Sequence, residues 1–161
     1  MKDLAPLISL ETVSLLTNIS KRTLWRRLSD GSLPRAAGVL PHNQVGVPIE
    51  AIHQWIGVPL TPEDHGLLRQ ADAGNTDAQT DLALIFLQYG KPEKAVYLLR
   101  LAAKHGNANA MHLLGRCLIG GRGVGTDEDM GIMWIARAAT LGHLMAKALM
   151  KALRSPGAAS R

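Results

Sequence analysis

HGNANAMHLLG (residues 105–115) is one of three related segments in this chain. Its glycine, Gly106, is followed four residues later by an alanine, and the same spacing follows a glycine 32 residues earlier and another 36 residues later. Periods of this size are typical of helical repeat proteins, in which each repeat is one supersecondary unit stacked on the next. The two other segments are AGNTDAQTDLA (73–83) and LGHLMAKALMK (141–151).

The chain between these segments is repeated as well. KAVYLLRLAAKHG (94–106) aligns with MGIMWIARAATLG (130–142), which places Leu98 against Trp134 and an alanine pair against an alanine pair. Each repeat therefore contains two helices, with alanines where the helices approach closely and larger side chains filling the space between them. The glycine that ends each second helix can adopt the left-handed conformation needed to reverse the chain. We predict an α-helical solenoid of about two and a half repeats over residues 60–161.

The most distinctive segment of the repeats is LIGGRGVGTDEDMGIMWIARAATLG (118–142). Its glycine-rich turn, acidic helix start, tryptophan and alanine pair before a glycine resemble the Sel-one-like repeats, which are relatives of the tetratricopeptide repeat. The equivalent turn of the first repeat, within QYGKPEKA (88–95), is about four residues shorter. We expect the repeats to dock another protein or to self-associate. Self-association would cover the apolar face of the last predicted helix (143–154), which carries Leu144, Leu149 and Leu153.

Before the repeats, SKRTLWRRLSDGSLP (20–34) predicts a short basic helix. Ser20 is suited to cap its N-terminus, and Leu24 and Leu28 repeat on one face. The helix is expected to stop at an Asp-Gly pair, where glycine can take the left-handed conformation. A second short helix, capped by Ser9, is predicted over residues 10–17. Two short helices joined so tightly are typical of a helix-turn-helix.

ISLETVSLLTNISKRTLWRRLSDGSLP (8–34), followed by VPIEAIHQWI (47–56), resembles the small winged helix-turn-helix domains of the excisionase and MerR-like group. The resemblance covers residues 7–57, and it implies a short β-hairpin, the wing, before the last helix. It also implies that the basic helix enters the major groove of double-stranded DNA. The candidate DNA-binding residues are then Lys21, Arg22, Trp25, Arg26 and Arg27.

The wing departs from the pattern of that family. Gly46 stands where such domains usually carry an arginine, and the segment AAGVLPHNQVG (36–46) offers only His42 and two amides. We therefore expect wing contacts with DNA to be weak or absent. Trp25 follows Leu24 and so points away from the apolar stripe, which leaves contact with DNA and packing against the wing as alternatives.

The charge of the chain is concentrated at the basic helix. The 161 residues carry a formal net charge of +5 with a pI near 9.7, and 47% of them are apolar, as in a globular protein. Residues 21–35 hold five Lys or Arg against one Asp. Such a cluster favours a polyanionic partner, and the alternative is a basic helix face that is only solvated.

No pattern in the sequence predicts an enzyme, a metal site or a cofactor. The six histidines lack zinc-ligand spacing, and GGRGVG (120–125) follows no strand and has no Gly-Lys-Ser/Thr ending, so it is interpreted as a turn. The acids 127–129 are consecutive at a helix start, where the helix dipole favours them. Cys117, the single cysteine, is expected to be a small core residue in a reducing compartment.

No apolar run approaches the ~20 residues of a transmembrane helix, so we expect a soluble, cytoplasmic protein that has no contact with membranes. The predicted domains are 1–59, a winged helix-turn-helix, and 60–161, the repeats. The predicted function is that of a DNA-binding transcriptional regulator whose repeats mediate dimerisation or protein docking. The alternative is a non-enzymatic adaptor protein with a degenerate helix-turn-helix.

Overall fold

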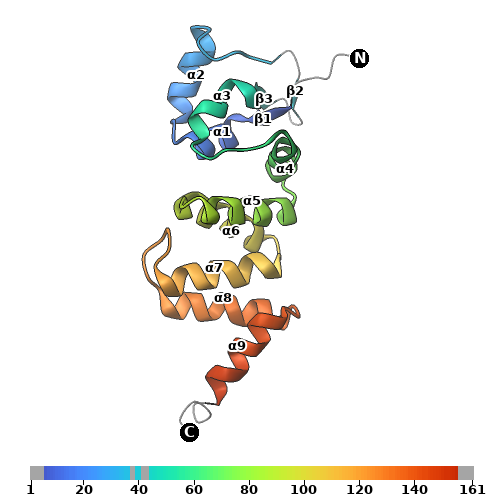
Figure 1. Cartoon of the computed structure of the whole chain (residues 1–161), viewed down its shortest axis with the longest axis vertical. Helices are drawn as coiled ribbons and strands as arrows, with labels where there is room; N and C mark the ends of the chain where they lie inside the picture. Colours follow the sequence, from blue (N-terminus) through green and yellow to red (C-terminus); the bar gives the residue numbers. More distant parts are fainter. Residues whose placement is uncertain (1–5, 37–38, 41–43, 156–161) are drawn as a thin grey trace. The chain divides into compact units, whose positions relative to one another are not determined.

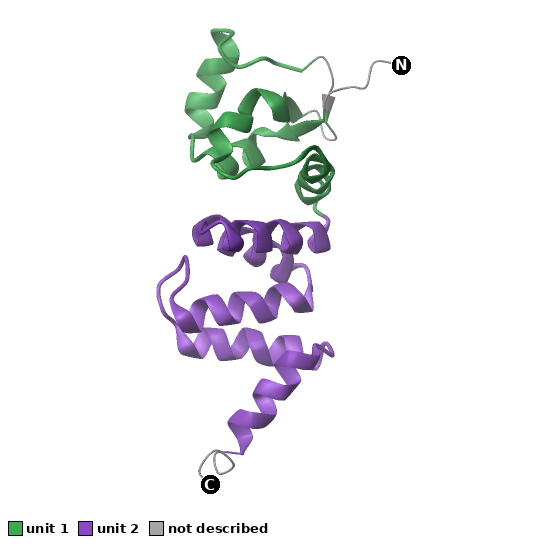
Figure 2. Cartoon of the chain, in the orientation of Figure 1, with its two compact units in different colours: residues 1–74 green, residues 75–161 purple. Residues whose placement is uncertain are grey.

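In a computed structural model of the chain, described for residues 6–36, 39–40 and 44–155, two compact units are present. They comprise residues 1–74 and 75–161, and Figure 2 shows them in green and purple. The structure is mostly helical, as predicted. The division between the units follows helix α4 (Pro62–Asp72), which packs with the N-terminal unit, whereas the sequence placed its boundary after residue 59.

The N-terminal unit combines four helices of the described residues with a small antiparallel sheet. The strand order is β1-β3-β2, with Ile8 opposite Val47 and Leu40 opposite Gln44. The pairing of β2 with β3 matches the predicted hairpin, whereas β1 was not predicted. His42 of the predicted wing lies outside the described residues. The elements are β1 (Leu7–Ser9), α1 (Leu10–Thr17), α2 (Lys21–Ser29), β2 (Val39–Leu40), β3 (Gln44–Pro48), α3 (Ile49–Ile56) and α4 (Pro62–Asp72).

Helices α1 and α2 begin at the predicted caps. The Ser9 hydroxyl accepts the N–H of Thr12 at 3.3 Å, and the Ser20 hydroxyl accepts the N–H of Thr23 at 3.2 Å. Asn18 links the two helices with a φ of 59°, a left-handed conformation that asparagine tolerates better than most residues. The apolar face of both helices joins α3 in one core. Its fully buried members include Val13, Leu16, Leu24, Ile52 and Ile56.

The Asp72 carboxylate at the end of helix α4 bonds to the start of α1. Asp72 accepts three hydrogen bonds: from the Ser9 N–H at 2.9 Å, from the Ser9 hydroxyl at 2.5 Å and from the Thr12 hydroxyl at 2.5 Å. The start of α4 is a capping box, in which Thr61 and Asp64 exchange side-chain to backbone hydrogen bonds. The hydrogen bonds of Asp72 explain why α4 belongs to the N-terminal unit although it follows the boundary placed after residue 59.

The C-terminal unit consists, within its described residues, of five helices, each packed against the next (Figure 1). Two helix pairs form two repeats, and the fifth helix occupies the place of the first helix in a third repeat. The helices are α5 (Thr76–Gln88), α6 (Pro92–Lys104), α7 (Ala108–Gly120), α8 (Glu128–Thr140) and α9 (Leu144–Arg154).

The repeated glycine-to-alanine spacing corresponds to a repeated helix cap. The residue after each glycine caps the next helix by accepting the N–H of the alanine: Asn75 at 3.0 Å, Asn107 at 2.9 Å and His143, through Nδ1, at 3.1 Å. The glycines themselves have left-handed φ angles, for example 90° at Gly106. The turns between successive repeats therefore confirm the predicted solenoid.

The two turns inside the repeats differ in length as predicted. Residues 89–91 connect α5 to α6, whereas residues 121–127 connect α7 to α8. Gly123 in the longer turn has a φ of 72°, and a Cβ at this position would collide with the backbone of Pro92 and Glu93 at the start of α6. The glycine-rich segment is thus a turn that packs on the preceding repeat.

Candidate functional site

Arg22, Trp25 and Arg26 are exposed side chains of α2. Their side chains lie off the stripe of Leu24 and Leu28, which is buried, and Trp25 remains 46% exposed. Neither arginine has a carboxylate partner within the described part of the chain. Two exposed guanidinium groups beside an exposed indole are thus free to meet an external partner.

The other two residues predicted to contact DNA have partners in the N-terminal unit. Lys21 Nζ lies 2.6 Å from Glu11 Oε2, and both side chains of this ion pair are well exposed. The Arg27 guanidinium lies 4.8 Å from the ring centroid of Trp55, a cation–π contact with α3. Sequence spacing did not indicate these partners, because each contact joins different helices.

Trp25 also borders a shallow hollow of about 280 Å³ next to β3. Gln44 and Val45 of β3 line the same hollow, and the Trp25 side chain remains 46% exposed. The hollow is lined by Ser9, Leu10, Glu11, Lys21, Trp25, Gln44 and Val45.

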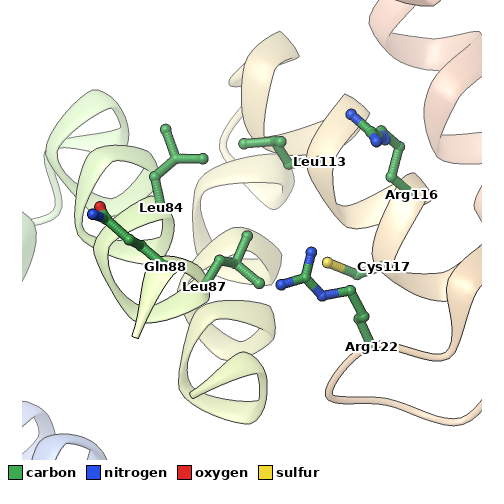
Figure 3. Close-up of a pocket in the computed structure, with 7 residues that line it drawn as sticks. All are labelled: Leu84, Leu87, Gln88, Leu113, Arg116, Cys117 and Arg122. Atoms are coloured by element: carbon green, nitrogen blue, oxygen red, sulfur yellow. The ribbon is translucent and has the colours of Figure 1, made fainter. Parts of the chain in front are cut away.

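In the repeats, a hollow of about 350 Å³ lies between the first helices of the two repeats, α5 and α7. Figure 3 shows Arg122 extending from the turn after α7 toward Leu87 of α5, whereas Arg116 lies nearer to Leu113 than to Leu87. Sequence reasoning missed this site because α5 and α7 are separated by α6 in the chain. The signal that could have found it is the repeat itself, which places equivalent faces of successive first helices side by side. The lining residues are Leu84, Leu87, Gln88, Leu113, Arg116, Cys117 and Arg122.

Cys117 contributes to the wall of this hollow but is itself buried. Burial raises the pKa of its thiol, an effect that Arg122 and Arg116 partly oppose. A thiol kept protonated is a poor nucleophile. The predicted role of Cys117 as a small core residue is confirmed by its burial.

A second hollow in this unit, of about 510 Å³, is bordered by α6, α7, α8 and the glycine-rich turn. Trp134, predicted to fill the space between helices, is only half-buried here, and the Arg137 guanidinium lies 5.0 Å from its ring centroid. Asp127 caps α8 by accepting the Met130 N–H at 2.9 Å. The lining residues are Arg100, Leu114, Leu118, Val124, Gly125, Thr126, Asp127, Met130 and Trp134.

Two histidines stack where α7 meets the start of α9. The ring centroids of His112 and His143 lie 4.5 Å apart, and the angle between the ring planes is 22°. His112 is 6% exposed, and its Nδ1 has no hydrogen-bond partner in the part of the chain that the structure describes. Burial lowers the pKa of His112, and the nearby His143 and Arg116 lower it further. His112 is therefore held neutral.

A search of residues 6–36, 39–40 and 44–155 found no group of three or more His, Cys, Asp or Glu residues arranged to hold a metal ion. Over the same residues, none of the helices has the length and apolar character needed to cross a membrane.

Comparison with known proteins identifies the repeats. The family model described as "Sel1 repeat" matches residues 76–107 and 108–143, which correspond to the two helix pairs α5–α6 and α7–α8. The crystal structure of a Sel1 repeat protein from Oxalobacter formigenes is 30% identical, with a TM-score of 0.54 over 60% of this chain and 76% of that chain. The chain belongs to the Sel1 repeat family. Both Sel1 repeats lie in the C-terminal unit. No match was found among curated proteins.

Proposed function

We propose that this Sel1 repeat protein is a non-enzymatic adaptor whose C-terminal unit docks a partner protein. The observation that carries the proposal is the pair of Sel1 repeats, which form a protein-interaction module. An open hollow lies between the first helices of the two repeats. Exposed apolar side chains on one face of a folded unit commonly mark an interaction site. Leu84 in α5, at 44% exposure, and Leu113 in α7 belong to this face.

Site-specific photocrosslinking tests the docking face. A photoreactive phenylalanine derivative at Leu84 should give a discrete crosslinked protein in cells, and excess unlabelled chain should suppress it. The matched control carries the same group at Lys104, which is exposed at the end of α6. The proposal fails if the hollow gives no adduct, or if both positions give the same adducts.

A second function, sequence reading of double-stranded DNA by α2, rests on one specific observation. Arg22 and Arg26 are exposed on α2, and neither forms an ion pair with a carboxylate among the residues described. Arginine at an exposed helix face suits both phosphate contacts and bidentate base contacts. In this proposal the adaptor would bring its docked partner to a DNA site, with Arg22, Trp25 and Arg26 in the groove.

A polarisation titration with genomic duplex fragments over a range of salt concentrations tests DNA reading. Arg22→Gln with Arg26→Gln should weaken binding and lower the slope of log K against log salt by about 0.9 for each phosphate that the protein no longer neutralises. The control pair, Arg35→Gln with Arg69→Gln, removes the same charge from exposed positions of the same unit outside α2. Equal affinity of the two double variants would end the DNA proposal and leave the docking proposal standing.

A further inference from the structure

The hollow between α5 and α7 combines an apolar surface with two guanidinium groups. Leu84, Leu87 and Leu113 supply the apolar lining, and Arg116 and Arg122 supply the charge. Its volume of about 350 Å³ is at the lower end of the ~300–1,000 Å³ range of ligand pockets. It can therefore accept one or two side chains of a bound segment.

The charge of both arginines is unbalanced. Arg116 and Arg122 are exposed, and neither forms an ion pair with a carboxylate anywhere in the described ranges. Two like charges beside one apolar surface repel cationic and favour anionic partners. Guanidinium groups bind carboxylates through two parallel hydrogen bonds, which adds geometric selectivity to the attraction.

The position of Arg122 is fixed by its backbone. Its N–H donates to the Cys117 carbonyl at 2.9 Å, directly after the left-handed cap of α7 at Gly121. The following glycine, Gly123, packs against the start of α6, where no side chain would fit. The glycine-rich turn therefore holds the arginine beside the hollow, a role beyond connecting two helices.

We propose that this hollow binds a segment of a partner protein in which Asp or Glu stands beside a bulky apolar residue. The carboxylate pairs with Arg116 and Arg122, and the apolar side chain lies on the three leucines. This inference rests on the proposed docking function and specifies the chemistry of the docked partner. An acidic residue alone would lack the apolar contact, and an apolar residue alone would leave the arginines unmatched.

Selection of a displayed library of random ten-residue peptides on the full chain tests the inference. The selected peptides should share an acidic residue next to Leu, Ile, Met or Phe. In a synthetic copy of one selected peptide, changing the acidic residue to its amide should weaken binding by tenfold or more. Changing the adjacent apolar residue to alanine should have an effect of similar size.

Charge reversal locates the site. Arg116→Glu with Arg122→Glu should weaken binding of the acidic peptide by tenfold or more, and a peptide with Lys in place of the acid should regain affinity for this variant. Both side chains are exposed, so the circular dichroism spectrum and melting temperature should stay nearly unchanged. The control pair is Arg100→Glu with Arg154→Glu, two exposed arginines outside this hollow, and it should bind normally.

Three results would overturn the inference: no bound peptide, selected peptides without an acid, or equal binding by the reversed variant and the parent. Peptides that bind the repeats without any dependence on Arg116 and Arg122 would leave protein docking intact while contradicting the chemistry proposed for it. A loss of docking itself would instead show in the crosslinking experiment at Leu84.

Discussion

Gly115 of α7 and Gly131 of α8 face each other where the two helices of the second repeat pack together. A Cβ on Gly115 would lie 2.6 Å from the Gly131 carbonyl oxygen, and a Cβ on Gly131 would lie 2.8 Å from the Gly115 carbonyl oxygen. Both distances are too short for a real side chain. The close approach of α7 and α8 therefore depends on the absence of side chains at both positions.

Gly115→Ala is expected to destabilise the C-terminal unit. The added methyl would meet backbone and the buried Ile135, so overpacking of about 1–3 kcal/mol should outweigh the gain in helix propensity. Chemical denaturation followed by circular dichroism measures the change. Gly120→Ala in the same helix is the control, because nothing lies within 4 Å of its added Cβ. A Gly115→Ala variant as stable as Gly120→Ala would show that the helices can separate at little cost.

Asp72→Asn should lower the stability of the N-terminal unit. The amide replaces one of the two acceptor oxygens by a donor that faces the donors of Ser9 and Thr12, and hydrogen bonds to charged groups contribute about 1.5–3 kcal/mol. The decrease should appear as earlier hydrogen exchange in α1 and α4. Asp81→Asn, at an exposed position of α5, should leave that exchange unaltered. Equal protection in both variants would contradict an anchoring role of Asp72.

The stacked histidines predict acid sensitivity at the start of α9. The pKa of His112 is lowered in the folded state, so the unfolded chain binds the proton more readily. Stability is therefore full above the ordinary histidine pKa of ~6.5 and decreases as the pH falls through that value toward the lowered pKa. The melting temperature should fall between pH 8 and pH 5.

His143→Asn tests the same site by restoring the cap used in the first two repeats. This variant keeps a side-chain cap and removes the ring that, after burial, helps to lower the pKa of His112, so its melting temperature should depend less on pH. His105→Asn, at an exposed position, serves as the control. The explanation is wrong if both variants retain the pH dependence of the parent.

Helix α9 should govern self-association if the repeats self-associate. Leu144 is 80% exposed and Met145 is 63% exposed, on a helix that has only α8 as an extensive neighbour in the described structure. Replacing both by Gln should shift any dimer measured by sedimentation at micromolar concentration toward monomer. Lys91→Gln with Lys104→Gln, at exposed positions at the two ends of α6, is the control outside α9. A dimer that persists in the Leu144 and Met145 variant would place the interface elsewhere.

Local signals in the sequence predicted the helices well. Ser9 and Ser20 each mark a helix start through a cap that spans three residues, and Leu24 with Leu28 marks a buried face by spacing alone. Repeat spacing predicted the two Sel1 repeats because the same turn recurs at fixed intervals. Strand β1 escaped prediction because three residues are too few for alternation to be recognised.

Contacts between distant residues could not be read from local patterns. The repeat pattern attributed close helix packing to alanines, whereas the close approach of α7 and α8 depends on Gly115 and Gly131. The sequence identified the cations of α2 but not their neighbours. Glu11 pairs with Lys21, and the Trp55 ring contacts Arg27. The hollow with Arg122 likewise depends on bringing α5 beside α7.

The carboxylate of Asp72 has a consequence for how the protein is made. Its acceptor oxygens bind residues that stand 60 and 63 positions earlier in the chain. A ribosome releases the amino terminus first, so β1 and α1 leave the exit tunnel well before the carboxylate that bonds α4 to them. When Asp72 emerges, the tunnel still encloses the residues that follow it, and these belong to the first Sel1 repeat (76–107). The N-terminal unit can therefore be completed only when synthesis has already entered that repeat.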